Sequence, residues 1–357
     1  MNNNPANTCI IVYPSFIQNE SRIFRIANVL KVKFPTCKIV LVGQGDESLP
    51  KVEVVDNNIE ILRFQVTSFY KIPLLKTYFF FKKWFGLIKE DIDPNKIKVF
   101  VSSSIEDLPL GVYYKKKNPN IKLIYDAHEL ETEKKGVTFR RKIKNKLSER
   151  KLIKYCDHVC VVSESIKQWY QNEYKLNNVI LLRNIPNKPN SFSPVNLKSS
   201  LGIPEKDVLC CYVGVFINGR GIDTLLEVFS NLKRSDMHIL FLGMGFKKDT
   251  IIRFARANKN IHYLEAVKPE NLLSYIKEID VGLCLIENIC LSYYYSLPNK
   301  LFEYSLAEVP VIGSDFPDIS AFINYHRCGW VIKPEVDNIY ELVNKLNLNI
   351  IHEVKAN

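Results

Sequence analysis

Residues 208–229 read VLCCYVGVFINGRGIDTLLEVF, and the fold prediction starts from this stretch. A continuous apolar run ends at Gly214, a short loop carries Gly219, Arg220 and Gly221, and an amphipathic helical pattern follows. Strands that are apolar on both faces are typical of a parallel sheet with helices on either side. The stretch therefore predicts one strand–loop–helix unit of a doubly wound α/β domain.

Similar apolar runs alternate with helical patterns along almost the whole chain. They lie at 9–13, 38–42, 59–64, 98–103, 122–127, 158–163, 179–183, 208–214, 238–243, 261–264, 281–286, 309–313 and 329–332. The alternation pauses once, at RNIPNKPNSFSPVN (183–196), which has the composition of a linker. We therefore predict two Rossmann-like domains, 1–185 and 186–357, with a hinge near 184–197 and a central cleft between the carboxyl ends of their strands.

The composition of the 357 residues limits the class of protein. Apolar residues make up 46% and charged residues 24%, as in globular proteins, and no uncharged apolar run is long enough to span a membrane. The start, MNNNPANTCIIVYPS, lacks the basic and apolar regions of a signal peptide, which predicts a cytoplasmic location. The nine cysteines form no CxxC pair, which predicts reduced thiols and no zinc site.

The positive charge of the chain is unevenly distributed. The formal net charge is +11, yet residues 1–190 hold 32 Lys and Arg against 19 Asp and Glu, while the remainder holds 17 against 19. A strongly basic first half predicts an anionic partner, which could be nucleic acid, a membrane surface or a phosphorylated substrate. We disfavour nucleic acid, because the basic runs contain no groove-reading or RNA-stacking motif.

The loop 215–221 has the residues of a phosphate site. Free N–H groups and the positive end of the following helix favour an anion, and Arg220 adds a charged donor fork. In LFLGMGF (240–246), Gly243 also allows close backbone approach. Glycines occur in such turns for steric reasons alone, and that reading stays open. Neither GxGxxG nor the Walker pattern is present, which argues against dehydrogenases and P-loop enzymes.

Residues 296–315, SLPNKLFEYSLAEVPVIGSD, predict a helix that leads into a strand. Pro298 suits the first turn of that helix, and Lys300 would stand at its positive end. Glu303, one turn further, could accept hydrogen bonds from two vicinal hydroxyls, such as those of a ribose. The same spacing fits a surface ion pair. Because the glycine-rich loop 215–221 is expected nearby, we favour the interpretation that Lys300 and Glu303 form part of a site for a nucleoside diphosphate.

Several motifs together resemble the nucleotide-sugar-dependent glycosyltransferases of the GT-B fold, and in particular the retaining glycosyltransferase family 4. They are Arg220 in NGRG, PNKLFEY (298–304), VPVIGSD (309–315), YDAHE (125–129), RNIPN (183–187) and SERKLIKYCDHVCVVSES (148–165). The resemblance follows the order of the chain over nearly its whole length. Its most specific part is PNKLFEY.

The resemblance implies roles for individual residues. It implies that Arg220 and Lys300 bind the donor diphosphate and assist catalysis, and that His128 lies beside the transferred sugar. The implied donor-binding residues are Gly214, Arg220, Gly243, Ala266, Val267, Tyr295, Lys300, Leu301 and Glu303. Cations would stabilise the departing diphosphate, so that neither a metal nor a cofactor is expected. Asp91-Ile92-Asp93 spells a DxD metal motif, but we expect it in a solvated turn after a helix.

The sequence departs from the family pattern in three places. Tyr295 stands where the family usually has a glutamate that contacts the donor sugar, and aromatic packing is an equal reading for Tyr293, Tyr294 and Tyr295. YPSFIQNESR (13–22) replaces a glycine-rich loop, which makes Ser15, Asn19, Ser21 or Arg22 candidates for the acceptor side, together with Glu129. The sequence also ends before the terminal helices that commonly return to the first domain.

Two basic runs predict contact with an anionic membrane surface. In KIPLLKTYFFFKKWFGLIKE (71–90), four lysines lie opposite an apolar face, and we expect Trp84 and the phenylalanines to enter the headgroup boundary. The run 134–155 adds further basic residues near the expected acceptor side. A core helix with solvated lysines is the alternative.

From these residues we expect a retaining hexosyltransferase of bacterial surface glycan synthesis, for lipopolysaccharide, capsule or exopolysaccharide. It would transfer a sugar from a nucleotide-sugar, a UDP-sugar in the first place, to a membrane glycolipid or polysaccharide. It would work in the cytoplasm, on the inner face of the membrane. The alternative is a protein of the same fold that binds a nucleotide-sugar without transfer, or an epimerase.

Overall fold

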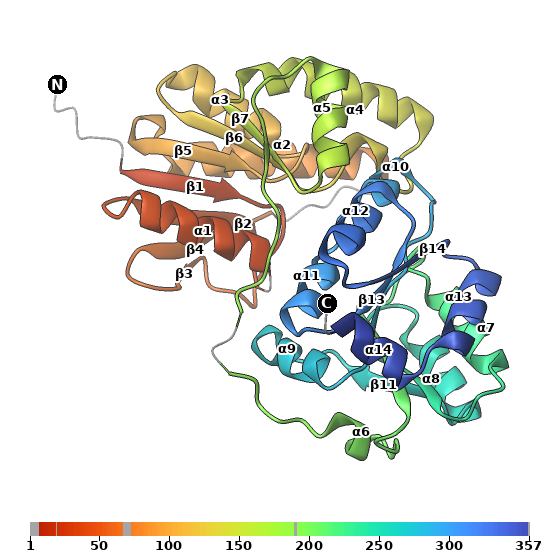
Figure 1. Ribbon diagram of the computed structural model, residues 1–357. Coiled ribbons are helices and arrows are strands. Elements are labelled where there is room, and N and C mark those ends of the chain that lie inside the picture. The colour runs from red at the N-terminus through yellow and green to blue at the C-terminus, as the bar shows by residue number, and fades with distance from the viewer. Residues whose placement is uncertain (1–6, 19, 67–72, 189–190, 356–357) are drawn as a thin grey trace. The chain divides into compact units, whose positions relative to one another are not determined.

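The computed structural model describes residues 7–18, 20–66, 73–188 and 191–355, which form two compact units, Met1–Leu182 and Arg183–Asn357 (Figure 1). Each unit is built on one sheet whose neighbouring strands are parallel, apart from a short edge strand in the first. The predicted fold class, two Rossmann-like doubly wound domains, is confirmed.

The sheet of the first unit has eight strands in the order β3-β4-β2-β1-β5-β6-β7-β8. Their bounds are β1 Thr8–Val12, β2 Lys38–Gly45, β3 Val52–Val54, β4 Ile59–Gln65, β5 Ile97–Ser102, β6 Lys122–Ala127, β7 His158–Val161 and β8 Val179–Leu181. Among the described strands of this sheet, only β3 runs antiparallel, against β4. The carboxyl ends of the other seven strands therefore share one edge, which is where ligands bind in sheets of this type.

The helices of the first unit are the crossovers between these strands. They are α1 Ser21–Lys33, α2 Pro73–Asp91, α3 Leu108–Lys117, α4 Phe139–Leu152 and α5 Glu164–Tyr174, with short 3₁₀ turns η1 Pro94–Lys96, η2 Glu131–Glu133 and η3 Ile153–Tyr155. Ile23, Ala27 and Leu30 of α1 pack on one face of the sheet, against the apolar residues of β1 and β2.

Helix α2 corrects one prediction. Trp84 and Ile88 are both 0% exposed, so the tryptophan belongs to the core and is not available to a lipid headgroup. The Trp84 ring lies among Phe80, Phe81 and Phe85. The side chains of residues 73–76, which include Lys76, lie outside the described part of the structure. Within the described ranges, no helix is long and apolar enough to cross a membrane.

The sheet of the second unit has six parallel strands in the order β11-β10-β9-β12-β13-β14. Their bounds are β9 Val208–Val215, β10 Met237–Met244, β11 Ile261–Glu265, β12 Val281–Cys284, β13 Val311–Ser314 and β14 Gly329–Ile332. The helices are α6 Leu197–Ser200, α7 Ile222–Asn231, α8 Lys248–Ala257, α9 Pro269–Lys277, α10 Leu291–Tyr294, α11 Asn299–Leu306, α12 Pro317–His326, α13 Val336–Lys345 and α14 Leu348–Lys355.

Alternate residues of each strand in this unit enter two different cores. Leu209, Cys211 and Val213 of β9 pack with α9, α11 and α12, whereas Cys210 and Tyr212 pack with α7, α8, α13 and α14. Both faces of the sheet are thus covered, which is why its strands lack polar alternation.

Candidate functional site

The strands β9 and β10 of the second unit come into close contact where they end. Gly214 and Gly243 are partners in the parallel register, and a Cβ on Gly243 would lie 1.9 Å from the Gly214 carbonyl oxygen. Gly243 has a φ of +155°, a conformation that other residues rarely adopt. No side chain fits at this point, so bare backbone forms this part of the edge.

The loop that follows β9 is held against the loop that follows β12. A Cβ on Gly219 would lie 2.3 Å from the Ile289 side chain. The Glu287 carboxylate accepts a hydrogen bond of 3.2 Å from the Gly221 N–H, and the Glu287 N–H donates to the Gly219 carbonyl over 3.1 Å. The NGRG loop is therefore fixed before any ligand arrives, and Arg220 projects from a rigid base.

Arg220 rests on an aromatic ring. The guanidinium carbon lies 4.3 Å from the centre of the Tyr293 ring, which belongs to α10. Among the described residues, the guanidinium forms no hydrogen bond or ion pair. The stacked ring holds the cation in place through its negative face and leaves the N–H groups for an external acceptor.

Lys300 stands at the start of α11, and Pro298 occupies the position just before that helix. The ammonium nitrogen lies 3.6 Å from the centre of the Tyr212 ring, and a Cβ on Gly214 would lie 3.8 Å from it. The cation thus reaches the carboxyl end of β9. No ion pair to Lys300 occurs in the part of the chain that the structure describes.

Arg220, Lys300 and Glu303 all influence the pKa of one thiol, that of Cys284, which is the last residue of β12. Burial raises the pKa of the Cys284 thiol to about 11. The positive charges of Lys300 and Arg220 act to lower this pKa, and the negative charge of Glu303 acts to raise it further. All three side chains are therefore within electrostatic reach of one buried thiol, although Arg220 comes from the loop after β9 and the other two come from α11.

Helix α11 is anchored by a residue that the sequence analysis did not single out. The Tyr304 hydroxyl donates to the carbonyls of Cys211 (3.0 Å) and Leu283 (3.3 Å) and accepts from the Val213 N–H over 3.2 Å. Tyr304 thereby ties α11 to both β9 and β12, and so fixes the position of Lys300 and Glu303 along the ends of these strands. In the sequence it is an ordinary apolar-face tyrosine, and only its contacts with the two strands β9 and β12 reveal its role.

The remaining predicted donor residues lie around this edge. Leu301 is 0% exposed and its N–H donates to the Pro298 carbonyl, so the structure gives it a packing position. Ala266 and Val267 follow β11 and are half-buried, and Val267 packs against the core. Tyr295 directly follows α10, and its ring centre lies 5.5 Å from that of Tyr294.

In the first unit, His128 follows β6 at the carboxyl edge of the sheet. Its Nδ1 is buried and has no hydrogen-bond partner within the described residues, and its ring lies 6.1 Å from that of Tyr13. Burial lowers the pKa of His128, against the opposing effect of the Asp126 and Glu129 carboxylates. The imidazole is therefore neutral near pH 7 and offers one lone pair or one N–H.

Arg22, a predicted acceptor-side residue, is already engaged. Its guanidinium donates to both Asp126 oxygens, over 2.8 and 2.5 Å, and to the Leu182 carbonyl over 3.0 Å. Asp126 is 1% exposed, so the pair is buried next to His128. Arg22 thus holds the end of β6 in place, and these contacts use three of its five N–H donors.

The other acceptor-side candidates differ in their surroundings. The Ser15 hydroxyl donates to the Glu20 carboxylate over 2.5 Å and accepts from the Ile17 N–H over 3.0 Å. Glu129 is 45% exposed and lies 3.2 Å from the Lys134 ammonium. Asn19 lies outside the described residues.

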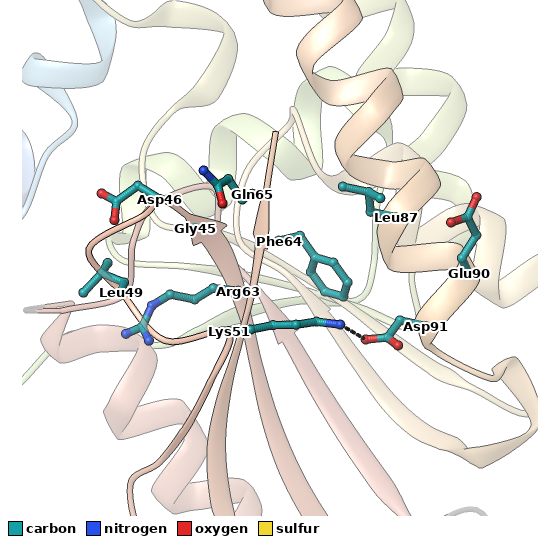
Figure 2. Close-up of a pocket in the computed structure, with 10 residues that line it drawn as sticks. All are labelled: Gly45, Asp46, Leu49, Lys51, Arg63, Phe64, Gln65, Leu87, Glu90 and Asp91. Atoms are coloured by element: carbon teal, nitrogen blue, oxygen red, sulfur yellow. Dashed lines mark ion pairs between the residues drawn. The ribbon is translucent and has the colours of Figure 1, made fainter. Parts of the chain in front are cut away.

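A pocket of about 390 Å³ opens at the same edge of the first sheet, between β4 and α2 (Figure 2). It is lined by Gly45, Asp46, Leu49, Lys51, Arg63, Phe64, Gln65, Leu87, Glu90 and Asp91. Arg63 is bonded to the Phe16 and Ile17 carbonyls, and Lys51 pairs with Asp91 at 3.5 Å. The pocket thus combines an aromatic ring with carboxylates and an amide, a combination that suits a polyhydroxylated molecule.

The comparisons with known sequences concern the second unit most directly. Residues 196–354 match the model of the family described as "Glycosyl transferases group 1". A protein of Haemophilus influenzae described as an uncharacterized glycosyltransferase is 26% identical over 198 residues, which cover 55% of this chain and 52% of that protein. The match thus spans about half the length of the curated relative.

Solved structures resemble the whole chain. The sucrose-phosphate synthase of Thermosynechococcus elongatus has a TM-score of 0.78 at 14% identity, with 98% of this chain and 93% of that chain covered. Anabaena HepE in complex with UDP and glucose has a TM-score of 0.70 at 10% identity, with 98% and 94% covered. WaaG, a glycosyltransferase involved in lipopolysaccharide biosynthesis, has 0.63 at 14%, with 98% and 94% covered. At these identities the likeness shows the fold, which is GT-B.

Proposed function

We propose, from the premise that residues 196–354 form a glycosyl transferases group 1 domain, that this protein transfers a hexose from a nucleotide-sugar to a glycan acceptor. We assign the donor to the second unit and take it to be a UDP-sugar, since the structurally similar HepE was solved with UDP and glucose. We further propose that the reaction retains the configuration of the transferred sugar.

One observation carries the proposal. Arg220 of the loop after β9 and Lys300 of α11 both act electrostatically on the buried Cys284 thiol, and each rests on an aromatic ring without an anionic partner in the described residues. Placing two cations together is unfavourable unless an anion joins them. A pyrophosphate bound beside the bare backbone of Gly214 and Gly243 would supply that anion.

The same residues give a mechanism. As the bond between the sugar and the diphosphate breaks, negative charge grows on the leaving phosphate, and two fixed cations stabilise that charge more than they stabilise the bound donor. Glu303, one turn into α11, is assigned to the ribose hydroxyls. His128, neutral and with an unpartnered Nδ1, is assigned to the transferred sugar.

The acceptor is assigned to the first unit. The pocket beside Phe64 and Gln65 offers hydrogen-bonding groups for a sugar at the carboxyl edge that also carries His128. We propose a lipid-linked or polysaccharide acceptor of bacterial surface glycan synthesis, on the cytoplasmic face of the membrane. The basic first half of the chain and the similarity in fold to WaaG support this choice.

Transfer assays with a panel of UDP-, GDP- and ADP-sugars test the proposal. Purified protein is incubated with each donor and with a glycolipid extract from bacterial envelopes, and the products are analysed by mass spectrometry. We expect turnover with one nucleotide class and loss of turnover in Glu303→Ala, with the unfolding temperature unchanged. Stabilisation by UDP without turnover on any acceptor would instead favour a binding-only protein, for which Tyr295 in place of a glutamate is the supporting observation.

A further inference from the structure

Helix α4 carries an apolar stripe that the rest of the unit does not cover. Phe139, Ile143 and Leu147 recur at every fourth residue, and their exposed fractions are 76%, 45% and 52%. Residues with this spacing share one side of a helix. An exposed stripe of three large apolar side chains on one helix is unusual on a protein surface and indicates a contact partner.

Positive charge follows the stripe along the adjacent side of the helix. Arg140 and Lys144 each come one residue after a member of the stripe, and Lys151 continues the row; all three are exposed. None of them forms an ion pair within the described residues. Glu149 is the sole acidic residue between Lys134 and Tyr155, and it is buried under the helix, where three tyrosine hydroxyls donate to it.

Two basic residues of α4 attach the helix firmly to the unit. Lys146 pairs with Glu133 at 3.0 Å and with Glu173 of α5 at 3.3 Å, and Arg150 pairs with Glu173 at 2.9 Å. In Figure 1, α4 lies beside α5. The helix is therefore held in place, and its apolar and unpaired basic sides both face outward.

We propose that α4 is a membrane-docking helix that lies in the interface of an anionic phospholipid bilayer. Phe139, Ile143 and Leu147 would enter the acyl boundary, and Arg140, Lys144 and Lys151 would contact lipid phosphates. This inference rests on the proposed function only in that it gives a lipid-linked acceptor its route to the enzyme. Vesicle binding can be measured without any donor or acceptor.

The exposed cations of α4 favour a lipid bilayer over a protein as the partner of this helix. An apolar stripe alone would fit another protein, but this stripe is bordered on its own helix by three exposed cations and by no exposed carboxylate, which matches an anionic surface with an apolar interior. In α2, the other candidate for docking, the large apolar residues Trp84 and Ile88 are buried, and among the described side chains only Tyr78 is a strongly exposed large hydrophobic residue.

The test measures binding of the full-length protein to vesicles by flotation. One set contains phosphatidylcholine with about a third phosphatidylglycerol, and the other is phosphatidylcholine alone. We expect binding to the anionic vesicles only, and a loss when NaCl rises from about 0.05 to about 0.5 M. The triple variant Phe139→Gln, Ile143→Gln, Leu147→Gln and the triple variant Arg140→Gln, Lys144→Gln, Lys151→Gln should each weaken binding by at least about tenfold.

The matched control is the α2 variant Lys82→Gln, Lys83→Gln, which removes two exposed lysines of the same unit and should change binding by less than about threefold. Insertion is tested with Phe139→Trp, in which lipids brominated in the acyl chains should quench more fluorescence than in the parent, whose three tryptophans give the baseline.

Several outcomes would overturn the inference. They are unchanged vesicle binding in both α4 variants, a larger loss in the α2 control, a tryptophan at position 139 that acyl bromines do not quench, or binding to an acidic polypeptide or RNA without binding to vesicles. If the protein binds vesicles through α4 but transfers no sugar, the proposed function fails and the docking helix stands. If it transfers sugar to a detergent-solubilised acceptor but ignores vesicles, the docking helix fails alone.

Discussion

The Lys300 ammonium lies 3.6 Å from the centre of the Tyr212 ring, at the end of the strand that carries Gly214. Tyr212 is 1% exposed, and its hydroxyl donates to the Val215 carbonyl over 3.1 Å. A buried ring that is fixed at its own hydroxyl cannot turn away from the cation. The position of Lys300 is thus set by the strand as well as by its helix, and this relationship makes its role testable.

Lys300→Ala should lower the transfer rate by about 10²- to 10³-fold, because it removes a cation that stabilises charge on the leaving phosphate. The unfolding temperature should stay within a few degrees of the parent value, since Lys300 is only half-buried. Rates are measured at saturating donor, and thermal unfolding is followed in parallel. A transfer rate near that of the parent would refute the assignment.

Tyr293→Leu should weaken UDP binding by about 2- to 30-fold, which corresponds to the loss of one cation–π contact with Arg220. Tyr293→Phe is the matched control, because it keeps the ring face on which the guanidinium rests. Isothermal titration with UDP gives the affinities. Equal losses in both variants would show that the hydroxyl, and not the ring, supports Arg220.

Gly243→Ala should destabilise the second unit by about 1–3 kcal/mol or more, since its Cβ would lie 1.9 Å from the Gly214 carbonyl at a φ of +155°. Gly86→Ala in α2 is the control: nothing lies within 4 Å of its Cβ, and alanine favours a helix interior by about 0.5–1 kcal/mol. Urea unfolding of each variant gives its free energy of unfolding, which should fall in Gly243→Ala and rise in Gly86→Ala. A stable Gly243→Ala protein would mean that the two strand ends separate easily.

Acidification should destabilise the second unit between about pH 6.5 and pH 4. Burial and the neighbouring His238 lower the pKa of His262 to about 4, and His238 in turn contacts Asp207 at 3.3 Å. The unfolded chain then binds a proton at a higher pH than the folded one, so this contribution to stability is fully present above pH 6.5 and is lost as the pH falls. His262→Gln should flatten this part of the profile of unfolding temperature against pH; an identical profile would contradict the assignment.

Arg22→Met should destabilise the first unit by about 3–5 kcal/mol, because it leaves the buried Asp126 carboxylate without its bidentate partner. The double variant Arg22→Met, Asp126→Leu should recover most of that loss, since no unpaired charge remains. Unfolding midpoints of the two variants are compared with that of Asp126→Leu. Equal stability of the single and double variants would show that the pair is not coupled.

The strands were predictable because a parallel sheet buries both faces, and a run such as VLCCYVG records this directly in the sequence. All thirteen predicted runs contain strands, whereas β3 Val52–Val54 was missed. That strand is short, exposed and at the edge of the sheet, so its residues carry no burial signal.

The parts of the site that were missed depend on distant partners. Glycine-flanked loops identify Arg220 and Lys300 locally, but the contact between Arg22 and Asp126 spans 104 residues, and no local pattern contains it. Tyr304 and Tyr212 look like core residues until the strands beside them are known. For Trp84, a helical wheel gave the correct apolar side of α2, yet it cannot tell whether lipid or protein covers that side.

The contact between Gly214 and Gly243 has a consequence for altering which donor is used. Gly214 and Gly243 meet through main-chain atoms and have no side chain to exchange. A substitution at Gly243 would therefore disturb the two strands instead of changing a contact with the donor. Under the proposed function, attempts to change the donor therefore belong at Tyr295 and at the turn after β11, which lie outside this contact.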